Sequence, residues 1–253
     1  MSSSAAFPVL PDDSLAISVP SSIELPGELP ERQASECLVH KTAVIDYPAS
    51  IGPGAEIGPF AHVAAGAKIG AGCRIGQNVQ VASTAVLGSG VTIEGNVVVG
   101  DGVTLEDGVR CGPGVVFTAA LKSPGERPDA CRAPIHLGPG VAVEANATIL
   151  AGTTIGQYAL ICAGAVVRGA VPPYAVMSGA RATPTDWVCR CGRGRLDFTL
   201  NLVACCPLCG QHYRMEGPRG PREFCPREES ARRKAELHDQ ERRYVESIMP
   251  STH

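Results

Sequence analysis

Aliphatic residues recur at every sixth position along most of the chain. The run begins at Val39, continues through 14 consecutive hexads to Phe117, and resumes from Leu137 to Val167. A small or β-branched residue usually precedes each of these anchors by two positions, which is the alternation expected of short strands. Three residues after the anchor, 13 of the 20 hexads carry Gly or Asn, the residues that most readily adopt positive φ. Each hexad therefore predicts a short strand followed by a sharp turn.

The hexads also predict how the strands are arranged. Three hexads close one triangular coil, so 20 hexads predict six to seven coils in a single stack. We expect an all-β chain whose residues 37–180 form a parallel β-helix. The segment 1–36, rich in Ser, Pro and Glu, is expected to be disordered or to cap the first coil.

The segment 118–134 breaks the register of the repeat. Its proline, glycine and charged residues exclude another pair of hexads, and long loops in a compact repeat are usually functional. A tolerated insertion without function is the alternative. The chain re-enters the repeat at Ile135-His136-Leu137, which places a histidine at the junction.

Composition narrows the class of protein. Glycine is abundant at 29 residues and aromatic residues make up 4%, so the core must be thin. The net charge of −3 gives no general attraction to nucleic acid or to an anionic membrane. The first residues lack the pattern of a signal peptide, no apolar run is long enough for a membrane span, and the 11 cysteines are unevenly placed. We therefore expect a soluble, cytoplasmic protein.

Two cysteine pairs follow the repeat. Cys189-Arg190-Cys191-Gly192 and Cys206-Pro207-Leu208-Cys209-Gly210 have the spacing of the two turns of a zinc ribbon. The predicted zinc ligands are Cys189, Cys191, Cys206 and Cys209. Four protein ligands leave no open position, so the predicted role is structural, in a module spanning 186–216. Cys205 is an alternative to Cys206, free thiols or redox chemistry are the alternative to zinc, and the charged run 217–253 predicts a short helical tail.

Several segments of the repeat resemble one family. These segments are Gly76-Gln77-Asn78-Val79, the run from Thr104 to Thr118, the run from Cys162 to Val167, and Val171-Pro172-Pro173-Tyr174-Ala175. They resemble the hexapeptide-repeat N-acetyltransferases that acetylate the 3-amino group of a UDP-linked 2-acetamido-3-amino glucuronate, over about 60% of the chain. The resemblance implies a left-handed winding. A homotrimer is predicted from apolar residues at outward positions of the hexads, namely Val86, Val98, Val116, Leu160 and Val166. The resemblance also implies transfer of an acetyl or other acyl group from acyl-CoA, with acetyl-CoA as the expected co-substrate, to an amine of a small molecule, most simply a nucleotide-linked amino sugar.

The chain departs from that family where the amine should bind. The family's asparagine at this place is Ala119 here, and Arg181-Ala182-Thr183 replaces its Pro-Ala-Arg. Two alternatives follow from these departures. One is an acyltransferase with a different biosynthetic acceptor, and the other is a non-catalytic trimeric scaffold.

The candidate site residues combine residue chemistry with this resemblance. A histidine is a frequent general base near neutral pH, and small residues and cations suit the arm and phosphates of CoA. The candidate catalytic residues are His136, His62, Glu106 and Thr118. The candidate acyl-CoA contacts are Gly164, Ala165, Arg168, Tyr174, Gly179 and Arg181. The candidate acceptor contacts are Asn78, Asn96 and Lys122, although the two asparagines and Asn146 are better explained as positive-φ turn residues at one corner of the prism.

Overall fold

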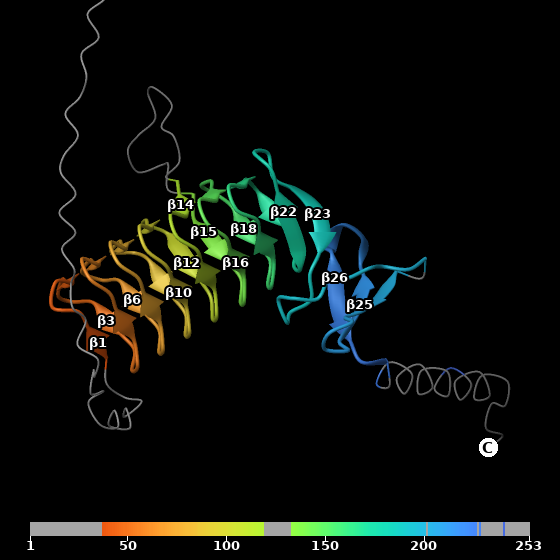
Figure 1. The fold of residues 1–253 in the computed structure, drawn as a ribbon, viewed down its shortest axis with the longest axis horizontal. Coiled ribbons are helices and arrows are strands. Elements are labelled where there is room, and N and C mark those ends of the chain that lie inside the picture. The colour runs from red at the N-terminus through yellow and green to blue at the C-terminus, as the bar shows by residue number, and fades with distance from the viewer. Residues whose placement is uncertain (1–36, 119–132, 201, 227, 229–239, 241–253) are drawn as a thin grey trace, which may run out of the picture. The chain divides into compact units, whose positions relative to one another are not determined.

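The structure is a computed structural model that describes residues 37–118, 133–200, 202–226, 228 and 240. Short strands wind around a triangular prism, and each strand pairs in parallel with the strand three places further along the chain (Figure 1). The predicted parallel β-helix of hexapeptide repeats is confirmed. The predicted N-terminal segment 1–36 and most of the loop 118–134 lie outside the described residues.

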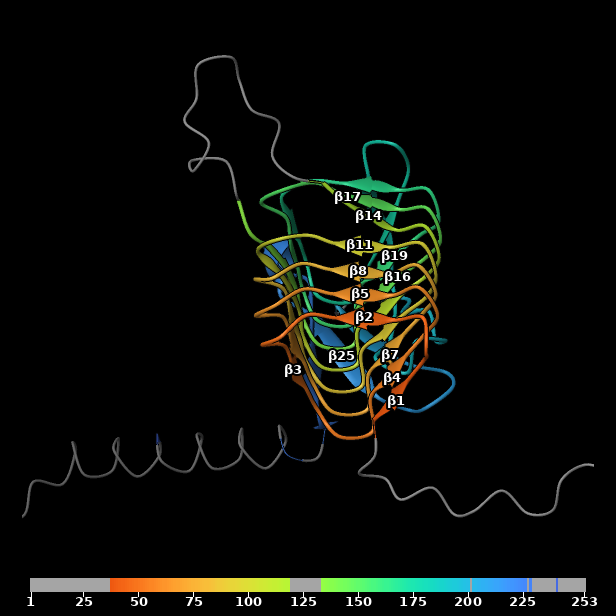
Figure 2. The same cartoon turned by 90° about the vertical axis from the view of Figure 1, so that its left-hand side faces the viewer.

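Three sheets form the sides of the prism. Sheet A contains β1 (Leu38–Val39), β4 (Glu56–Ile57), β7 (Arg74–Ile75), β10 (Thr92–Ile93), β13 (Arg110–Cys111), β16 (Ala142–Val143), β19 (Leu160–Ile161), β22 (Ala175–Ser178) and β23 (Thr183–Trp187). Sheet B contains β2 (Val44–Ile45), β5 (His62–Val63), β8 (Gln80–Val81), β11 (Val98–Val99), β14 (Val116–Phe117), β17 (Thr148–Ile149) and β20 (Val166–Val167). Sheet C contains β3 (Ser50–Ile51), β6 (Lys68–Ile69), β9 (Val86–Leu87), β12 (Val103–Leu105), β15 (Ile135–Leu137), β18 (Thr154–Ile155) and β21 (Ala170–Val171). Figure 2 shows the strands of sheet B lying one above another.

The stack is longer than the six-residue period predicts. After Val167 the next anchor is Val171, four residues later, and Met177 follows at the usual spacing. Both side chains are buried, so β21 and β22 continue the core beyond the last predicted hexad. The shortened turn after β20 hides this continuation from a search with a fixed period.

Inward anchors fill the prism with aliphatic side chains. Leu105, Leu137 and Ile155 are stacked neighbours in sheet C, and all three are almost completely buried. Cys73 and Cys111 are also buried, as expected of small core residues. The core is thin because every coil contributes one anchor from each sheet, and this explains how a chain so poor in aromatic residues can fold.

The corners between the sheets carry the predicted turn residues. We call them the A–B, B–C and C–A corners, after the two sheets that each one joins in chain order. At the C–A corner five successive glycines have positive φ, namely Gly54, Gly72, Gly90, Gly108 and Gly140. In the last two coils the same place is taken by Tyr158 and Tyr174, whose φ values are 56° and 61°. At the C-terminal end of this corner, two tyrosines therefore occupy the positions that glycines occupy in the earlier coils.

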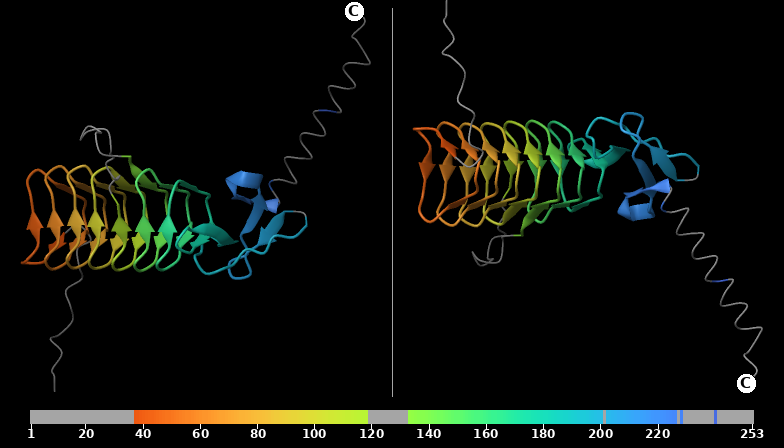
Figure 3. Two further views of the ribbon diagram at one scale, coloured as in Figure 1. Left: turned by 90° about the horizontal axis from the view of Figure 1, so that it is seen from above. Right: turned by 90° about the horizontal axis from the view of Figure 1, so that it is seen from below.

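The chain leaves the prism through β23, which folds back antiparallel on β22. A three-stranded antiparallel sheet follows, made of β24 (Val203–Cys205), β25 (His212–Met215) and β26 (Pro221–Phe224), with the short 3₁₀ helix η1 (Gly217–Arg219) before β26. We call residues 188–224 the ribbon; it lies beyond the last coil in both views of Figure 3. The ribbon extends past the predicted boundary at 216, because residues 217–224 form η1 and a sheet strand rather than a helical tail. Most of the remaining tail lies outside the described residues.

Within the part of the chain that the structure describes, no helix is long and apolar enough to cross a bilayer.

Candidate functional site

The structure pairs His136 with Glu106. His136 points outward from β15, and Glu106 follows the adjacent strand β12, so coil stacking brings together residues that lie 30 positions apart. The His136 Nε2 atom lies 2.7 Å from the Glu106 Oε1 atom. Among the described residues the Nδ1 atom of His136 has no hydrogen-bond partner. The imidazole of His136 can therefore accept a proton at Nδ1 while the Glu106 carboxylate contacts Nε2.

The pair lies beside the break in the repeat. The loop starts after Thr118, at the B–C corner, and its far end returns through Ala133. The Thr118 hydroxyl accepts a hydrogen bond from the Ala151 amide at 3.2 Å, and the Gly152 amide donates to the Ala133 carbonyl at 3.2 Å. Both ends of the loop are thus tied to one turn of the following coil, close in sequence to His136. Lys122 and Ala119 lie outside the described residues.

His62 forms a second pair of the same kind. Its Nε2 atom lies 2.9 Å from the Asp46 Oδ2 atom, and both side chains are about half exposed. It belongs to β5 of sheet B, whereas His136 belongs to β15 of sheet C, three coils further along the stack. The structure therefore does not bring the two candidate histidines together.

The candidate CoA contacts are distributed over three corners. At the A–B corner Gly164 has a φ of 67° with open space where a side chain would project. The turn from Gly179 to Ala182 lies beside it, because the Val166 amide donates to the Gly179 carbonyl at 3.0 Å, and this turn carries the exposed Arg181.

The other three candidates lie elsewhere. Ala165 is fully buried with its side chain in the core, and Arg168 is exposed at the B–C corner. Tyr174 is 2% exposed at the C–A corner, beneath the ribbon.

Asn78 and Asn96 stack at the A–B corner, with Asn146 further along the same corner. All three have positive φ, and the Asn78 Nδ2 atom donates to the Asn96 Oδ1 atom at 3.2 Å. The turn interpretation accounts for this backbone conformation. Because Asn78 and Asn96 hydrogen-bond to each other, the amide groups in this bond are not free to bind the acyl-acceptor substrate.

The four predicted zinc ligands form one cluster. Their Sγ atoms all lie within 4.8 Å of one another, with 3.4 Å between Cys189 and Cys209 and 3.8 Å between Cys191 and Cys206. Tetrahedral zinc with Zn–S bonds of about 2.3 Å requires sulfur atoms about 3.8 Å apart. The spacing therefore fits one zinc ion.

The two turns that hold these cysteines have a matching geometry. The Gly192 amide donates to the Cys189 carbonyl and the Gly210 amide to the Cys206 carbonyl, at 2.8 Å and 2.9 Å. Gly194 lies so close to Cys206 that a Cβ atom there would collide with its sulfur. The spacing of the cysteines alone does not predict that Gly194 packs against the cluster, although its place in the run Cys-x-Cys-Gly-x-Gly could have indicated it.

Neighbouring groups shift the pKa values of the cysteine thiols in this cluster. Backbone hydrogen bonds from Arg193, with a further one from Gly194, lower the pKa of the Cys191 thiol to about 6, which favours the thiolate that a metal requires. Burial raises the pKa of Cys189 to about 12, so that thiol ionises readily only with a cation beside it. The Tyr213 hydroxyl lies 3.1 Å from the Cys189 sulfur, and burial raises its pKa, so it keeps a proton to donate to a thiolate.

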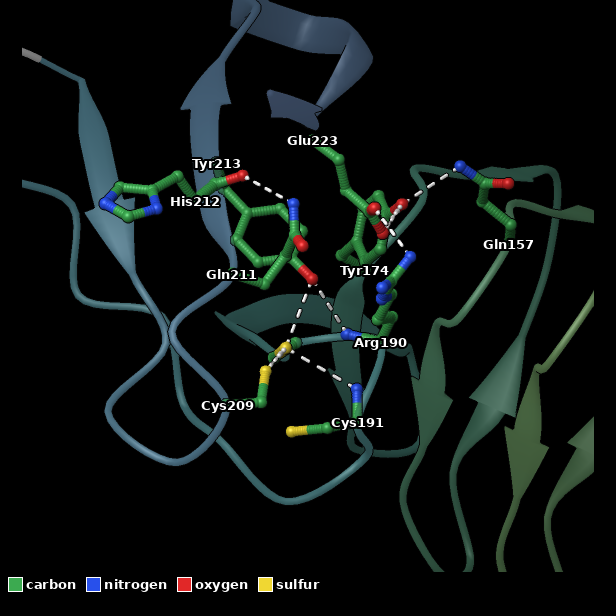
Figure 4. A network of polar contacts seen from close by, with 10 residues as sticks. Gln157, Tyr174, Arg190, Cys191, Cys209, Gln211, His212, Tyr213 and Glu223 are labelled. Atoms are coloured by element: carbon green, nitrogen blue, oxygen red, sulfur yellow. Dashed lines mark hydrogen bonds and ion pairs between the residues drawn. The ribbon is translucent and has the colours of Figure 1, made fainter. Parts of the chain in front are cut away.

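A polar network connects the cysteine cluster to the last coil (Figure 4). The Tyr213 ring contacts the edge of the Tyr174 ring at 5.1 Å between centroids. The Tyr174 hydroxyl donates to the Glu223 Oε1 atom at 2.8 Å and accepts from the Gln157 Nε2 atom at 3.0 Å. The Arg190 Nη1 atom donates to the second oxygen of Glu223 at 3.2 Å. Nothing in the period of the repeat predicts this network, but the replacement of corner glycines by Tyr158 and Tyr174 is a signal for it.

The six-residue repeats and the three parallel sheets define a hexapeptide-repeat β-helix protein. Residues 48–83 and 134–169 match the family described as "Bacterial transferase hexapeptide (six repeats)". The match supports the assignment of the repeats in these two segments as hexapeptide repeats.

Among curated proteins, the chain is similar to a sugar-nucleotide acetyltransferase. It is 39% identical over 75 residues to dTDP-3-amino-3,6-dideoxy-alpha-D-galactopyranose 3-N-acetyltransferase of Aneurinibacillus thermoaerophilus, covering 30% of this chain and 38% of that protein. It is also 39% identical over 51 residues to a probable acetyltransferase of Mycobacterium tuberculosis, covering 20% of this chain and 17% of that protein. The chain thus spans well under half the length of these relatives.

Among solved structures, the chain is similar to a hexapeptide-repeat acetyltransferase of Vibrio cholerae in complex with acetyl-CoA. The identity is 28%, covering 49% of this chain and 72% of that chain, with a TM-score of 0.44.

Proposed function

We propose that this protein is a CoA-dependent N-acyltransferase that moves an acetyl group from acetyl-CoA to an amine of a nucleotide-linked amino sugar. The observation that carries the proposal is the His136–Glu106 pair beside the loop that interrupts the coil. The similarity to a 3-N-acetyltransferase of a dTDP-linked 3-amino sugar supports this substrate class.

The pair suits the chemistry of amide formation. The amine nitrogen attacks the thioester carbonyl carbon, the carbon–sulfur bond breaks, and the amine loses a proton. His136 takes that proton at Nδ1 and returns one to the departing sulfur. Glu106 orients the ring and stabilises the imidazolium formed on the way. Placement of the two substrates against each other supplies the rest of the rate enhancement.

Acyl-CoA is assigned to the A–B corner at the end of the stack, in a groove that a neighbouring subunit of the proposed trimer closes. This corner lies opposite sheet C within one chain, so the thioester would meet the His136–Glu106 pair of that neighbour. Gly164 leaves the surface open there, and the adjoining turn brings Gly179 and the cation Arg181. A guanidinium is well suited to the phosphates of CoA. His62, on another sheet and in an earlier coil, has no role in this proposal.

A homotrimer is part of the proposal. Val98 and Val116 are paired neighbours on sheet B and are 52% and 49% exposed, and Val166 lies further along the same line, beyond Thr148. Exposed apolar side chains that lie side by side in this way are typical of a surface covered by another subunit. Val86 and Leu160, which share the outward pattern in the sequence, lie on sheets C and A instead.

Zinc bound by the four cysteines is proposed as a structural ion. Four thiolates would complete its coordination, and the metal would order a module whose buried core is small. Reduced thiolate ligands and an acyl-CoA substrate both favour a cytoplasmic location.

The test is acceptor-dependent release of CoA. Purified protein is incubated with acetyl-CoA and a panel of dTDP- and UDP-linked 3-amino and 4-amino sugars, and free thiol and acetylated product are measured. The expected result is transfer to at least one acceptor, with the loss of activity in His136→Gln described below. Acetyl-CoA binding with transfer to another class of amine would retain the acyltransferase and replace the acceptor. Failure of calorimetry to detect acetyl-CoA binding to the intact protein would refute both and leave a scaffold.

A further inference from the structure

A pocket lies where the ribbon meets the last two coils. It has a volume of about 420 Å³, within the range of about 300–1,000 Å³ typical of small-molecule sites. The coils contribute Gln157, Tyr158 and Tyr174 at the C–A corner, and the ribbon contributes Arg190, Arg222 and Glu223. It is separate from the proposed acyl-CoA contacts at the A–B corner and from His136 on sheet C.

The walls of this pocket are held in place from both sides. The Tyr158 and Tyr174 rings stack at 5.6 Å between centroids, and the Tyr174 hydroxyl has two hydrogen bonds. On the ribbon side, a Cβ atom on Gly220 would come within 3.1 Å of both Pro172 and Trp187. Such close packing leaves the start of β26 little freedom to move away from the coil, so the pocket is preformed.

Positive charge predominates around the pocket. Three guanidinium groups, those of Arg190, Arg219 and Arg222, face two carboxylates. Arg219 and Arg222 share the carboxylate of Glu216 through long contacts of 3.8 Å and 3.5 Å. Arg190 uses one nitrogen on Glu223, at 3.2 Å, and that carboxylate is also held by Tyr174. Several guanidinium N–H groups thus remain available for a ligand.

We propose that this pocket binds the phosphate groups of a small molecule and that it holds them only while the metal-bound cysteine cluster keeps Arg190 in place. Guanidinium groups match phosphate oxygens with paired hydrogen bonds, and Tyr158 supplies an aromatic wall beside them. Arg190 lies between the ligands Cys189 and Cys191, and its amide donates to Tyr213 at 3.1 Å, so its position depends on the cluster. The metal dependence rests on the zinc proposed above, whereas phosphate binding does not depend on acyl transfer.

The test is calorimetric titration of the full-length, zinc-containing protein with inorganic pyrophosphate at low ionic strength. We expect saturable binding to one site per chain. Arg190→Gln should weaken it at least about tenfold, because a hydrogen bond between charged partners is lost. Arg193→Gln is the matched control: it removes the same charge from an exposed position outside the pocket and should change affinity less than about twofold. Absence of saturable binding at millimolar pyrophosphate, or equal losses in the two variants, would overturn the proposal.

Two further experiments identify the role of the metal and the molecule that carries the phosphate. Chelator-treated protein should lose pyrophosphate binding while its β-helix circular dichroism persists; retained binding would overturn the metal dependence. Titrations of Arg190→Gln with acetyl-CoA and with dTDP or UDP then assign the site. Weaker acetyl-CoA binding assigns it to the acyl donor, weaker nucleotide binding assigns it to the acceptor, and no change in either assigns it to a separate phosphate ligand. Because these are binding measurements, they stand even if no acyl transfer is found.

Discussion

Glu106→Gln separates the role of the carboxylate from that of the histidine beside it. The substitution keeps the shape of the side chain but removes the charge that faces the His136 ring across 2.7 Å. Because these side chains are 41% and 42% exposed, solvent screens the contact, and ion pairs at such positions contribute at most about 1 kcal/mol. About 1.4 kcal/mol corresponds to a tenfold change in rate, so kcat should fall by at most about fivefold. His136→Gln removes the base itself and should lower kcat by ~10²–10⁴.

The assay is the release of CoA at saturating acetyl-CoA, with kcat and KM determined separately. We expect the loss to appear in kcat, and Glu106→Gln should cost nothing further when added to His136→Gln, because the two residues act as one unit. Asp46→Asn is the matched control, since Asp46 pairs with His62 at 2.9 Å on another sheet, and its kcat should be unchanged. The reasoning fails if His136→Gln retains more than half of the activity, or if Asp46→Asn is as damaging as Glu106→Gln.

Three further predictions concern the ribbon and the assembly. Wild-type protein should contain about one zinc per chain by elemental analysis, and Cys209→Ser should release it while the circular dichroism of the β-helix is retained; metal retained by the variant would contradict the ligand set. Gly220→Ala should loosen the ribbon and accelerate proteolysis there, because its φ of 82° and ψ of −170° suit only glycine and because a Cβ atom would press on Pro172 and Trp187, whereas Gly217→Ala, in open space, should be cleaved more slowly; equal proteolysis would contradict the tight packing at Gly220. In analytical ultracentrifugation, Val116→Glu should dissociate a trimer through a buried charge, while Val86→Glu on sheet C should not; a monomeric wild type would remove the basis for the proposed assembly.

The repeat made most of the fold predictable from sequence. A residue such as Leu105 or Ile155 is buried because it recurs at six-residue intervals, and its register depends on neighbours in the next coil rather than on distant segments. The four cysteines were predictable for a similar reason, because each turn of the cluster is a local motif that positions two sulfur atoms. Where the period itself changed, as in the short step from Val167 to Val171, the six-residue pattern no longer identified the inward positions, although β21 and β22 lie within the predicted β-helix of residues 37–180.

The sequence by itself determined the strands, the turns, the thin aliphatic core and the identity of the cysteine cluster, because each follows from residues a few positions apart. The tertiary structure decided which outward side chains meet. Glu106 reaches His136 because one coil closes across the loop, while His62 lies on another sheet. Tyr174 meets Glu223 across 49 residues because the ribbon packs on the last coil. Such pairs depend on the number of residues in each coil and on how two modules pack, and no local pattern encodes either.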